Sequence, residues 1–347
     1  MNTASPLNYP SAPDPLCSGR IKQQPQDFKV VEQLGFDLSG SGEHLFLSVQ
    51  KTGLTTHQLI DRLADQLDVS PRQIGYSGLK DKQAVTQQWI SVQLPGCKTI
   101  PEIEQDDDLQ LLQAGWHDKK LRVGSHRANA FDIVVRDVNA DGDALARQQQ
   151  AILEQGFANY FGEQRFGGAQ DNVAQALRAL NNRHRRKRLS RNKKSLFLSA
   201  LRSELFNRIL SRRIAQGVWR QPLDGDVFML AGTQSVFSEA LDDTLLRRYQ
   251  QFDIHAGVSL FGEGESRLSG EALALEQGVL SEQEEIVQTL LGGGVKRAYR
   301  ANRAIAHQLQ MEFDGTAGVL KLRVVLDKGV YLTTLLSHFL DISASSP

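Results

Sequence analysis

The stretch Gly75-Tyr-Ser-Gly-Leu-Lys-Asp-Lys-Gln-Ala-Val-Thr-Gln-Gln-Trp-Ile-Ser-Val92 places one carboxylate, Asp81, between two lysines in a glycine-containing turn. The turn leads into an apolar segment that is typical of a β-strand, and a rigid strand can hold one side chain at a fixed point. Lys80 and Lys82 add positive charge, which favours the ionised carboxylate and attracts an anionic ligand. By spacing alone, the same residues also fit a charged surface turn.

Composition and charge are those of an ordinary globular protein. The 347 residues are enough for a sizeable core and suggest two domains, and 40 basic residues balance 40 acidic ones. Cys17 and Cys97 are too few for a disulfide framework or a zinc site, which fits a reducing compartment. Residues 1–15 lack the apolar core of a secretory signal, and no apolar run approaches 18 residues. We therefore expect a cytoplasmic protein without a membrane segment.

Hydrophobic periodicity predicts both strands and helices. A helix begins after Thr55, because Gln58 three residues later completes a capping box, and its apolar stripe runs from Leu59 to Leu67. Strands are predicted at 28–32, 44–50, 89–94, 130–136 and 320–326, and further helices at 144–153, 172–180, 194–215 and 333–340.

The predicted secondary structure changes near residue 140, where strands are followed by mostly helical segments. Near the C-terminus a strand and a helix are predicted again. A lone C-terminal strand and helix need another sheet to pack on. We therefore expect an α+β protein in which one discontinuous domain is interrupted by an insertion.

The segment from Arg178 to Arg213 is strongly basic. It holds thirteen lysines and arginines and one acidic residue, Glu204, so its net charge is +12 and the rest of the neutral chain carries −12. The densest part runs from Arg183 to Lys194. This segregation favours a phosphate-binding face for RNA or DNA. A solvated helix face is the simpler alternative.

Motifs for cofactors and metals are absent from the sequence. It contains neither a phosphate-binding Gly-x-x-x-x-Gly-Lys-Ser/Thr nor a Gly-x-Gly-x-x-Gly, and no Gly-x-Ser-x-Gly nucleophile elbow. The histidines are scattered without the spacing of metal ligands. The residues therefore indicate a protein that uses no metal and no cofactor.

Blocks of sequence extend the evidence of the Asp81 turn over nearly the whole chain from residue 20. Besides Lys80-Asp-Lys-Gln-Ala-Val85, they are Lys22 with Pro25-Gln-Asp-Phe-Lys-Val-Val-Glu32, Gly42-Glu-His-Leu-Phe-Leu47, Leu121-Arg-Val-Gly124 with Asn129-Ala-Phe131, Asn159-Tyr-Phe-Gly-Glu-Gln-Arg-Phe-Gly167, Arg202-Ser-Glu-Leu-Phe-Asn207 and Asp224-Gly-Asp226. In this order, the blocks resemble those of the TruD family of tRNA pseudouridine synthases.

The resemblance implies an activity and a fold. The activity is isomerisation of uridine to pseudouridine at position 13 of tRNA, without cofactor. The fold is the pseudouridine synthase fold, a mixed and mostly antiparallel sheet flanked by helices, with an inserted α/β TRUD domain across a basic cleft. By position, residues 1–19 are a flexible leader, 20–155 and 304–347 form the discontinuous catalytic domain, and 156–303 form the inserted domain.

The resemblance also implies the role of Asp81. As the essential carboxylate, it adds to the ribose C1′ or the base C6 as a nucleophile, or it removes a proton from C2′ to give a glycal. Both routes remain open from the sequence. Lys22 is expected near this carboxylate, where its charge keeps Asp81 ionised.

The nucleotide pocket and the RNA-backbone contacts follow from the same family positions. Phe28 and Tyr331 are expected to hold or stack the flipped nucleotide, Asn129 to hydrogen-bond it, and Phe131 to form a wall of the pocket. The expected contacts to the RNA backbone are Arg183, Arg185, Arg186, Lys187, Arg188, Arg191, Lys193 and Lys194.

The sequence departs from the family pattern at a few positions. Leu79 stands where Gln is usual, Ala128 where Gly is usual, Tyr331 where Phe is frequent, and Ser337-His338 where family members typically carry Arg-Glu. An RNA-binding or RNA-chaperone protein with weakened catalysis is therefore an alternative function, and a DNA-binding regulator is a further one. We expect a monomer whose partner is tRNA.

Overall fold

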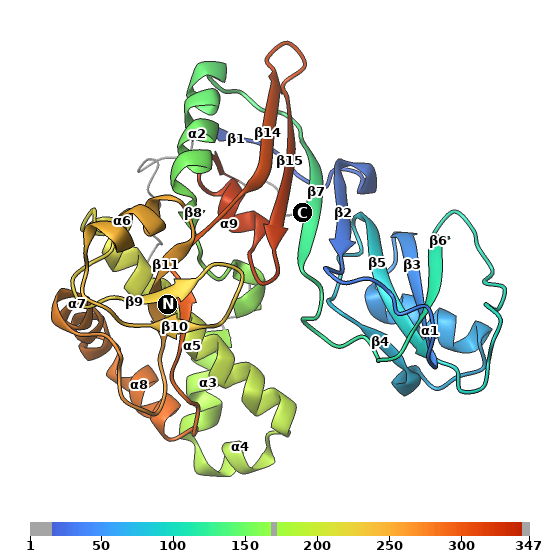
Figure 1. Cartoon of the computed structure of the whole chain (residues 1–347), viewed down its shortest axis with the longest axis horizontal. Helices are drawn as coiled ribbons and strands as arrows, with labels where there is room; N and C mark the ends of the chain where they lie inside the picture. Colours follow the sequence, from blue (N-terminus) through green and yellow to red (C-terminus); the bar gives the residue numbers. More distant parts are fainter. Residues whose placement is uncertain (1–15, 168–171, 342–347) are drawn as a thin grey trace. The chain divides into compact units, whose positions relative to one another are not determined.

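The computed structural model describes residues 16–167 and 172–341, and it divides into two compact units (Figure 1). In the described part of the chain, the sheet unit comprises Leu16–Leu153, Ala306–Gly329 and residues 339–341. The helical unit comprises Glu154–Ile305 and Val330–His338. Each unit is therefore assembled from segments that lie far apart in the sequence.

The sheet unit is built on an eight-stranded mixed sheet with the order β14-β15-β7-β2-β5-β3-β6, to which β4 is added beside β5. Within this sheet, only β2 and β5 run parallel, and the other pairs are antiparallel. The strands are β2 (Phe28–Gln33), β3 (His44–Thr52), β4 (Ile74–Tyr76), β5 (Val85–Gln93), β6 (Leu109–His117), β7 (Ala128–Val135), β14 (His307–Asp314) and β15 (Val319–Asp327). The C-terminal strands β14 and β15 thus join the sheet that the N-terminal segment begins.

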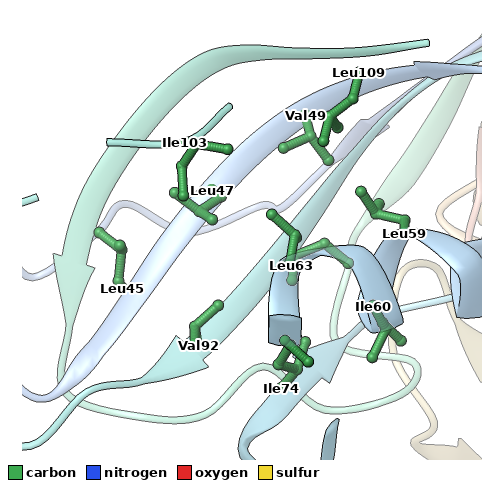
Figure 2. Packing of buried hydrophobic residues seen from close by; sticks show 12 residues of the cluster. Leu45, Leu47, Val49, Leu59, Ile60, Leu63, Ile74, Val92, Ile103 and Leu109 are labelled. Atoms are coloured by element: carbon green, nitrogen blue, oxygen red, sulfur yellow. The ribbon is translucent and has the colours of Figure 1, made fainter. Parts of the chain in front are cut away.

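Helix α1 (Thr56–Gln66) covers one face of this sheet. The Thr55 side chain accepts a hydrogen bond from the Gln58 backbone and the Gln58 side chain accepts one from Thr55, so the predicted capping box is present. Figure 2 shows the apolar side of α1 packed on strand residues in a cluster formed by Leu45, Leu47, Val49, Leu59, Ile60, Leu63, Ala64, Ile74, Ile90, Val92, Ile103 and Leu109. Truncating one such leucine to alanine typically costs about 2–5 kcal/mol, so this cluster fixes α1 on the sheet.

Helix α2 (Gly142–Gln155) packs near the other end of the sheet, where the Gln149 amide donates to the carbonyl of Leu309 in β14. Short strands β1 (Cys17–Ser18) and β16 (Leu340–Asp341) pair in parallel and join the two ends of the described chain. Both α2 and β15 lie close to their predicted ranges.

The long helix α5 (Arg191–Ala215) lies at the centre of the helical unit, and many of its side chains are buried among apolar residues. A four-stranded sheet of order β10-β9-β11-β12 packs with it. The other elements are β8 (Phe157–Ala158), α3 (Asn172–Asn181), α4 (Arg183–Arg188), β9 (Val227–Leu230), β10 (Val236–Phe237), α6 (Asp243–Gln250), β11 (Ile254–Leu260), α7 (Gly270–Ser281), α8 (Glu284–Leu291), β12 (Ala298–Ala301), β13 (Arg303–Ala304) and α9 (Leu332–Leu336). Over residues 16–167 and 172–341, no helix has the length and apolar character needed to cross a membrane.

Two predicted boundaries are wrong. The helix predicted at 333–340 ends at Leu336, because Ser337 is its C-cap and Leu340 pairs with Cys17 as part of a strand. The strand predicted at 89–94 begins earlier, at Val85. Its first half contains polar residues, among them Gln88, which is buried and accepts a hydrogen bond from the Thr56 hydroxyl. Because these inward side chains are polar, this half of the strand lacks the alternating apolar residues from which a strand is predicted.

Candidate active site

The Asp81 turn connects β4 to β5 in the sheet unit. Its backbone is fastened by two hydrogen bonds, one from the Lys80 N–H to the Thr56 hydroxyl (2.9 Å) and one from the Lys51 ammonium to the Asp81 carbonyl (2.9 Å). Gly75 in β4 is required, because a Cβ there would lie 2.4 Å from the Leu121 carbonyl oxygen. The carboxylate therefore projects from a turn whose backbone is tied to its surroundings.

Lys22 is the side chain that pairs with Asp81. Its ammonium lies 2.7 Å from Asp81 Oδ2 and 4.4 Å from the centre of the Phe28 ring, which is a cation–π contact. The Lys22 backbone has φ of 57°, a left-handed conformation that a lysine adopts at a cost of about 1 kcal/mol. The Asp81 side chain remains 38% exposed, so the carboxylate is accessible beside its cation.

A buried carboxylate anchors the segment that carries Lys22. Asp27 in the short 3₁₀ turn Pro25–Asp27 accepts two hydrogen bonds from the Arg136 guanidinium, at 2.7 and 2.9 Å. These bonds hold the pKa of Asp27 below its usual range. The turn leads directly into Phe28 and β2, so the Asp27–Arg136 pair fixes the approach of Lys22 to the sheet.

Lys80 forms an ion pair with a carboxylate other than Asp81. Its ammonium lies 2.6 Å from Glu32 Oε2, and both side chains are buried, with exposed fractions of 7% and 0%. The other oxygen of Glu32 accepts a hydrogen bond from the Trp89 backbone. Lys80 therefore connects the turn to β2 and β5, and it is not an ion-pair partner of Asp81. The carboxylate partner offsets the cost of burying this cation. The other flanking lysine, Lys82, is exposed.

The predicted pocket residues of the sheet unit share one face of the sheet. Strands β2 and β7 pair so that Phe131 lies opposite Val30 and Asn129 lies opposite Glu32. The rings of Phe28 and Phe131 meet edge to face, with their centres 6.4 Å apart. The structure thus brings Asp81, Lys22, Phe28 and Phe131 together through a chain of direct contacts.

Asn129 belongs to a hydrogen-bonded chain that the sequence did not reveal. Its amide nitrogen lies 3.2 Å from His126 Nε2, and His126 Nδ1 lies 2.6 Å from the hydroxyl of Ser77, at the start of the Asp81 turn. Burial lowers the pKa of His126. No sequence motif marks His126, and its role becomes visible only when the turn and β7 are seen together.

Tyr331 lies in the helical unit, at the N-terminus of α9. Its ring meets Phe161 edge to face, with the centres 6.2 Å apart. The Phe161 backbone is held by the side-chain amide of Asn207, which accepts from its N–H and donates to its carbonyl. A Cβ at Gly162 would come within 2.8 Å of the Thr333 hydroxyl and 3.2 Å of the Tyr331 ring, so glycine is required there. The Asn-Tyr-Phe-Gly motif therefore builds the support of Tyr331.

An arginine also contacts the Phe161 ring. The Arg300 guanidinium is 4.3 Å from the centre of the Phe161 ring and donates to the backbone carbonyl and the side chain of Asn159. Burial lowers the pKa of Arg300 to about 10. Arg165 stacks on the same ring at 5.7 Å.

Ser337 and His338 act inside the helical unit. His338 Nε2 accepts a hydrogen bond from the Ala158 backbone N–H at 3.1 Å, and the Ser337 hydroxyl donates to the Thr333 carbonyl at 2.9 Å. His338 is buried, and this burial lowers its pKa to about 3. The imidazole is therefore neutral and serves as an acceptor that fastens the end of α9 to β8, where the family pattern has a charged pair.

The basic segment consists of paired and unpaired residues. Arg208, Arg212 and Arg213 form ion pairs with Glu204, Glu282 and Asp226, so they do not contribute free positive charge. By contrast, none of the carboxylates in the described parts of the chain lies within ion-pairing distance of Arg185, Arg186, Lys187, Arg188, Arg191, Lys193 and Lys194. All of these are exposed except the half-buried Lys194. The Arg183 side chain lies outside the described residues.

Residues that could hold a metal do not gather in the parts of the chain that the structure describes: no group of three or more His, Cys, Asp or Glu side chains is positioned for one. The site thus consists of a carboxylate, an ammonium, two aromatic rings and an amide in the sheet unit. Within the helical unit, the structure describes the predicted ring of Tyr331 and a basic helical surface.

Comparison with known proteins shows the family to which this chain is related. The model of the tRNA pseudouridine synthase D (TruD) family matches residues 8–177 and 170–339. The chain belongs to the TruD family. It is 43% identical over 329 residues to the tRNA pseudouridine synthase D of Idiomarina loihiensis, covering 94% of this chain and 93% of that protein. It is 39% identical over 329 residues to that of Methylococcus capsulatus, covering 94% and 92%.

A solved structure confirms the predicted fold class. The putative tRNA pseudouridine synthase D of Methanosarcina mazei superposes with a TM-score of 0.75 and 22% identity, covering 96% of this chain and 95% of that one. The TruD chain is therefore an α+β protein with the pseudouridine synthase fold, as the sequence blocks indicated. Its mixed, mostly antiparallel sheet carries the Asp81 turn.

Proposed function

We propose that this protein isomerises uridine to pseudouridine in tRNA, at position 13 as the resemblance implies. The observation that carries the proposal is an accessible carboxylate, Asp81, paired at 2.7 Å with Lys22 on a turn that buried contacts hold in place. Relatives at about 40% identity that bear the name tRNA pseudouridine synthase D support it.

The reaction requires a carboxylate and no redox chemistry. The N-glycosidic bond breaks, the uracil rotates, and a carbon–carbon bond forms between C5 and C1′, so substrate and product are isomers. Asp81 serves either as a nucleophile at C1′ or C6, or as the base that removes a proton from C2′ and later returns it. In both routes the proton on C5 is lost after the new bond forms, and N1 gains one.

The surrounding residues suit a nucleotide that has left its stack. Phe28 and Phe131 are aromatic rings linked to Asp81 through Lys22, and Asn129 supplies an amide whose Oδ1 has no hydrogen-bond partner among the described residues. The family resemblance assigns a further stacking ring to Tyr331, which Phe161 holds within the helical unit. Lys22 keeps a positive charge beside the negative reacting group.

We propose that the unpaired basic residues of α4 and of the start of α5 contact the tRNA backbone. Apart from the half-buried Lys194, the described side chains among them are exposed, whereas Arg208, Arg212 and Arg213 of α5 form ion pairs with carboxylates. Such contacts make binding dependent on salt, because each phosphate contact releases counterions.

The test is to map pseudouridine in unmodified tRNA after incubation with wild type, Asp81→Asn and Asp61→Asn, using carbodiimide-dependent primer extension. Asp61 is an exposed residue of α1 and serves as a matched control for the loss of one carboxylate. We expect product at a single position with wild type and Asp61→Asn, and none with Asp81→Asn. Absence of pseudouridine with wild type, or full activity of Asp81→Asn, would refute the proposal.

A further inference from the structure

Lys51 is a charged residue in the interior of the sheet unit. It lies in β3 opposite Thr86 of β5, and its side chain has no exposed surface. Its ammonium donates to the backbone carbonyls of Leu54, at 2.5 Å, and Asp81, at 2.9 Å. A buried ammonium is costly unless its charge and its N–H groups are used. A methionine would fill this space without that cost. The presence of a lysine here therefore indicates that its ammonium has a role in the structure of the Asp81 turn.

Two bonds to consecutive residues fix the peptide that carries Asp81. The Lys80 N–H donates to Thr56 and the Asp81 carbonyl accepts from Lys51, and both partners come from the junction between β3 and α1. Leu54, the other acceptor of Lys51, lies in that same junction. The Asp81 carboxylate is left to Lys22. Backbone and side chain are therefore oriented by two different lysines.

We propose that Lys51 is a positioning residue for the isomerisation, because its ammonium fixes the Asp81 backbone and supplies positive charge near this residue. This inference rests on the proposed function. A displacement of the reacting group by about 1 Å can reduce the rate about 100-fold, so loss of one of two backbone anchors is expected to reduce kcat more than it changes KM.

The surroundings of Lys51 set the pH range in which its side chain loses its positive charge. Burial is the main cause that lowers its pKa, to about 8; the negative charge of Asp81 opposes this effect and the positive charge of Lys80 adds to it. Lys80 is itself paired with Glu32, and Asp81 with Lys22. Above pH 8 the ammonium becomes an amine, which keeps two N–H groups for its two carbonyls but loses its charge.

The experiment compares wild type, Lys51→Met, Lys51→Arg and the control Thr86→Val. Thr86 lies opposite Lys51, and its buried hydroxyl has no hydrogen-bond partner in the described chain, so the control alters the same layer without touching Asp81. We expect Lys51→Met to lower kcat about 10- to 100-fold with KM within about 3-fold. We expect wild-type kcat to fall above pH 8, and Lys51→Arg to remove this alkaline decline because arginine stays charged. Thr86→Val should behave as wild type.

A second measurement does not depend on activity. Hydrogen exchange of the backbone amides at 77–84 should be faster in Lys51→Met than in Thr86→Val, since only the former loses the bond to Asp81. Wild type without pseudouridine formation would refute the proposed function but leave this exchange test intact. Wild-type kcat in Lys51→Met, or unchanged exchange at 77–84, would overturn the inference. If Lys51→Met does not fold, an alkaline decline that persists in Lys51→Arg would overturn it.

Discussion

Acid should destabilise this protein through one buried imidazole. His338 is buried and accepts the Ala158 N–H, and its pKa in the folded protein is about 3. In the unfolded chain a histidine titrates near 6.5. Between these two values the unfolded state binds a proton that the folded state excludes, so stability is complete above about pH 6.5 and is lost as the pH falls.

The expected magnitude follows from the two pKa values. Each unit of pH below 6.5 costs about 1.4 kcal/mol until the folded-state pKa is reached. At pH 5, His338 should therefore reduce the free energy of unfolding by about 2 kcal/mol relative to pH 7.5. His338→Gln keeps an oxygen that can accept the Ala158 N–H but does not titrate in this range.

The assay is urea unfolding at pH 7.5 and pH 5, followed by circular dichroism and tryptophan fluorescence, for wild type, His338→Gln and His184→Gln. His184 is exposed in α4 and controls for the loss of any histidine. Wild type and His184→Gln should lose about 2 kcal/mol more than His338→Gln between the two pH values. Equal losses in wild type and His338→Gln would refute the assignment of His338 as a neutral acceptor.

Further variants test the supports of the site. Lys80→Met should lower the free energy of unfolding by about 3–5 kcal/mol in urea titrations, because it leaves the buried Glu32 unpaired, and the double variant with Glu32→Gln should recover part of this loss. Arg136→Leu should destabilise by about 1–3 kcal/mol and lower kcat, since Asp27 loses two bonds. Replacing residues 185–188 by glutamine should weaken tRNA binding and flatten its salt dependence in filter-binding titrations; an unchanged slope would exclude phosphate contacts there.

The fold could be predicted from sequence where apolar residues recur with a regular period. Leu45, Leu47 and Val49 marked β3, but the same period continues to Lys51, whose side chain is as buried as theirs. In β2, Phe28 and Val30 are followed by the buried Glu32. A charged residue at an inward position of a strand is a signal for a buried polar role, and it could have identified both residues. Their partners, however, depend on tertiary contacts.

Counting charges overestimated the free positive charge of the basic segment. The total of +12 is correct for the sequence, but carboxylates from the same helix, from Asp226 and from Glu282 neutralise three of its arginines. Glu282 and Asp226 lie more than ten residues along the chain from the arginines that they pair with. A local sequence pattern therefore does not predict these pairs. Most of the exposed basic residues that have no ion-pair partner in the described parts of the segment lie between Arg185 and Lys193, which narrows the surface that we propose for tRNA.

Three of the four lysines near Asp81 show how the surroundings give chemically identical groups different roles. Lys22 is partly exposed and pairs with the carboxylate, Lys80 is buried with Glu32, and Lys51 is enclosed beneath the Asp81 carbonyl. Adjacency in sequence suggested that Lys80 gives Asp81 electrostatic support, and the structure shows that the Lys80 ammonium forms its ion pair with Glu32 of β2. The residue nearest in sequence therefore braces the turn, and the one 59 positions away contacts the reacting group. Exchanging Lys22 and Lys80 for methionine in turn should separate these roles, with loss of kcat in the first case and loss of stability in the second.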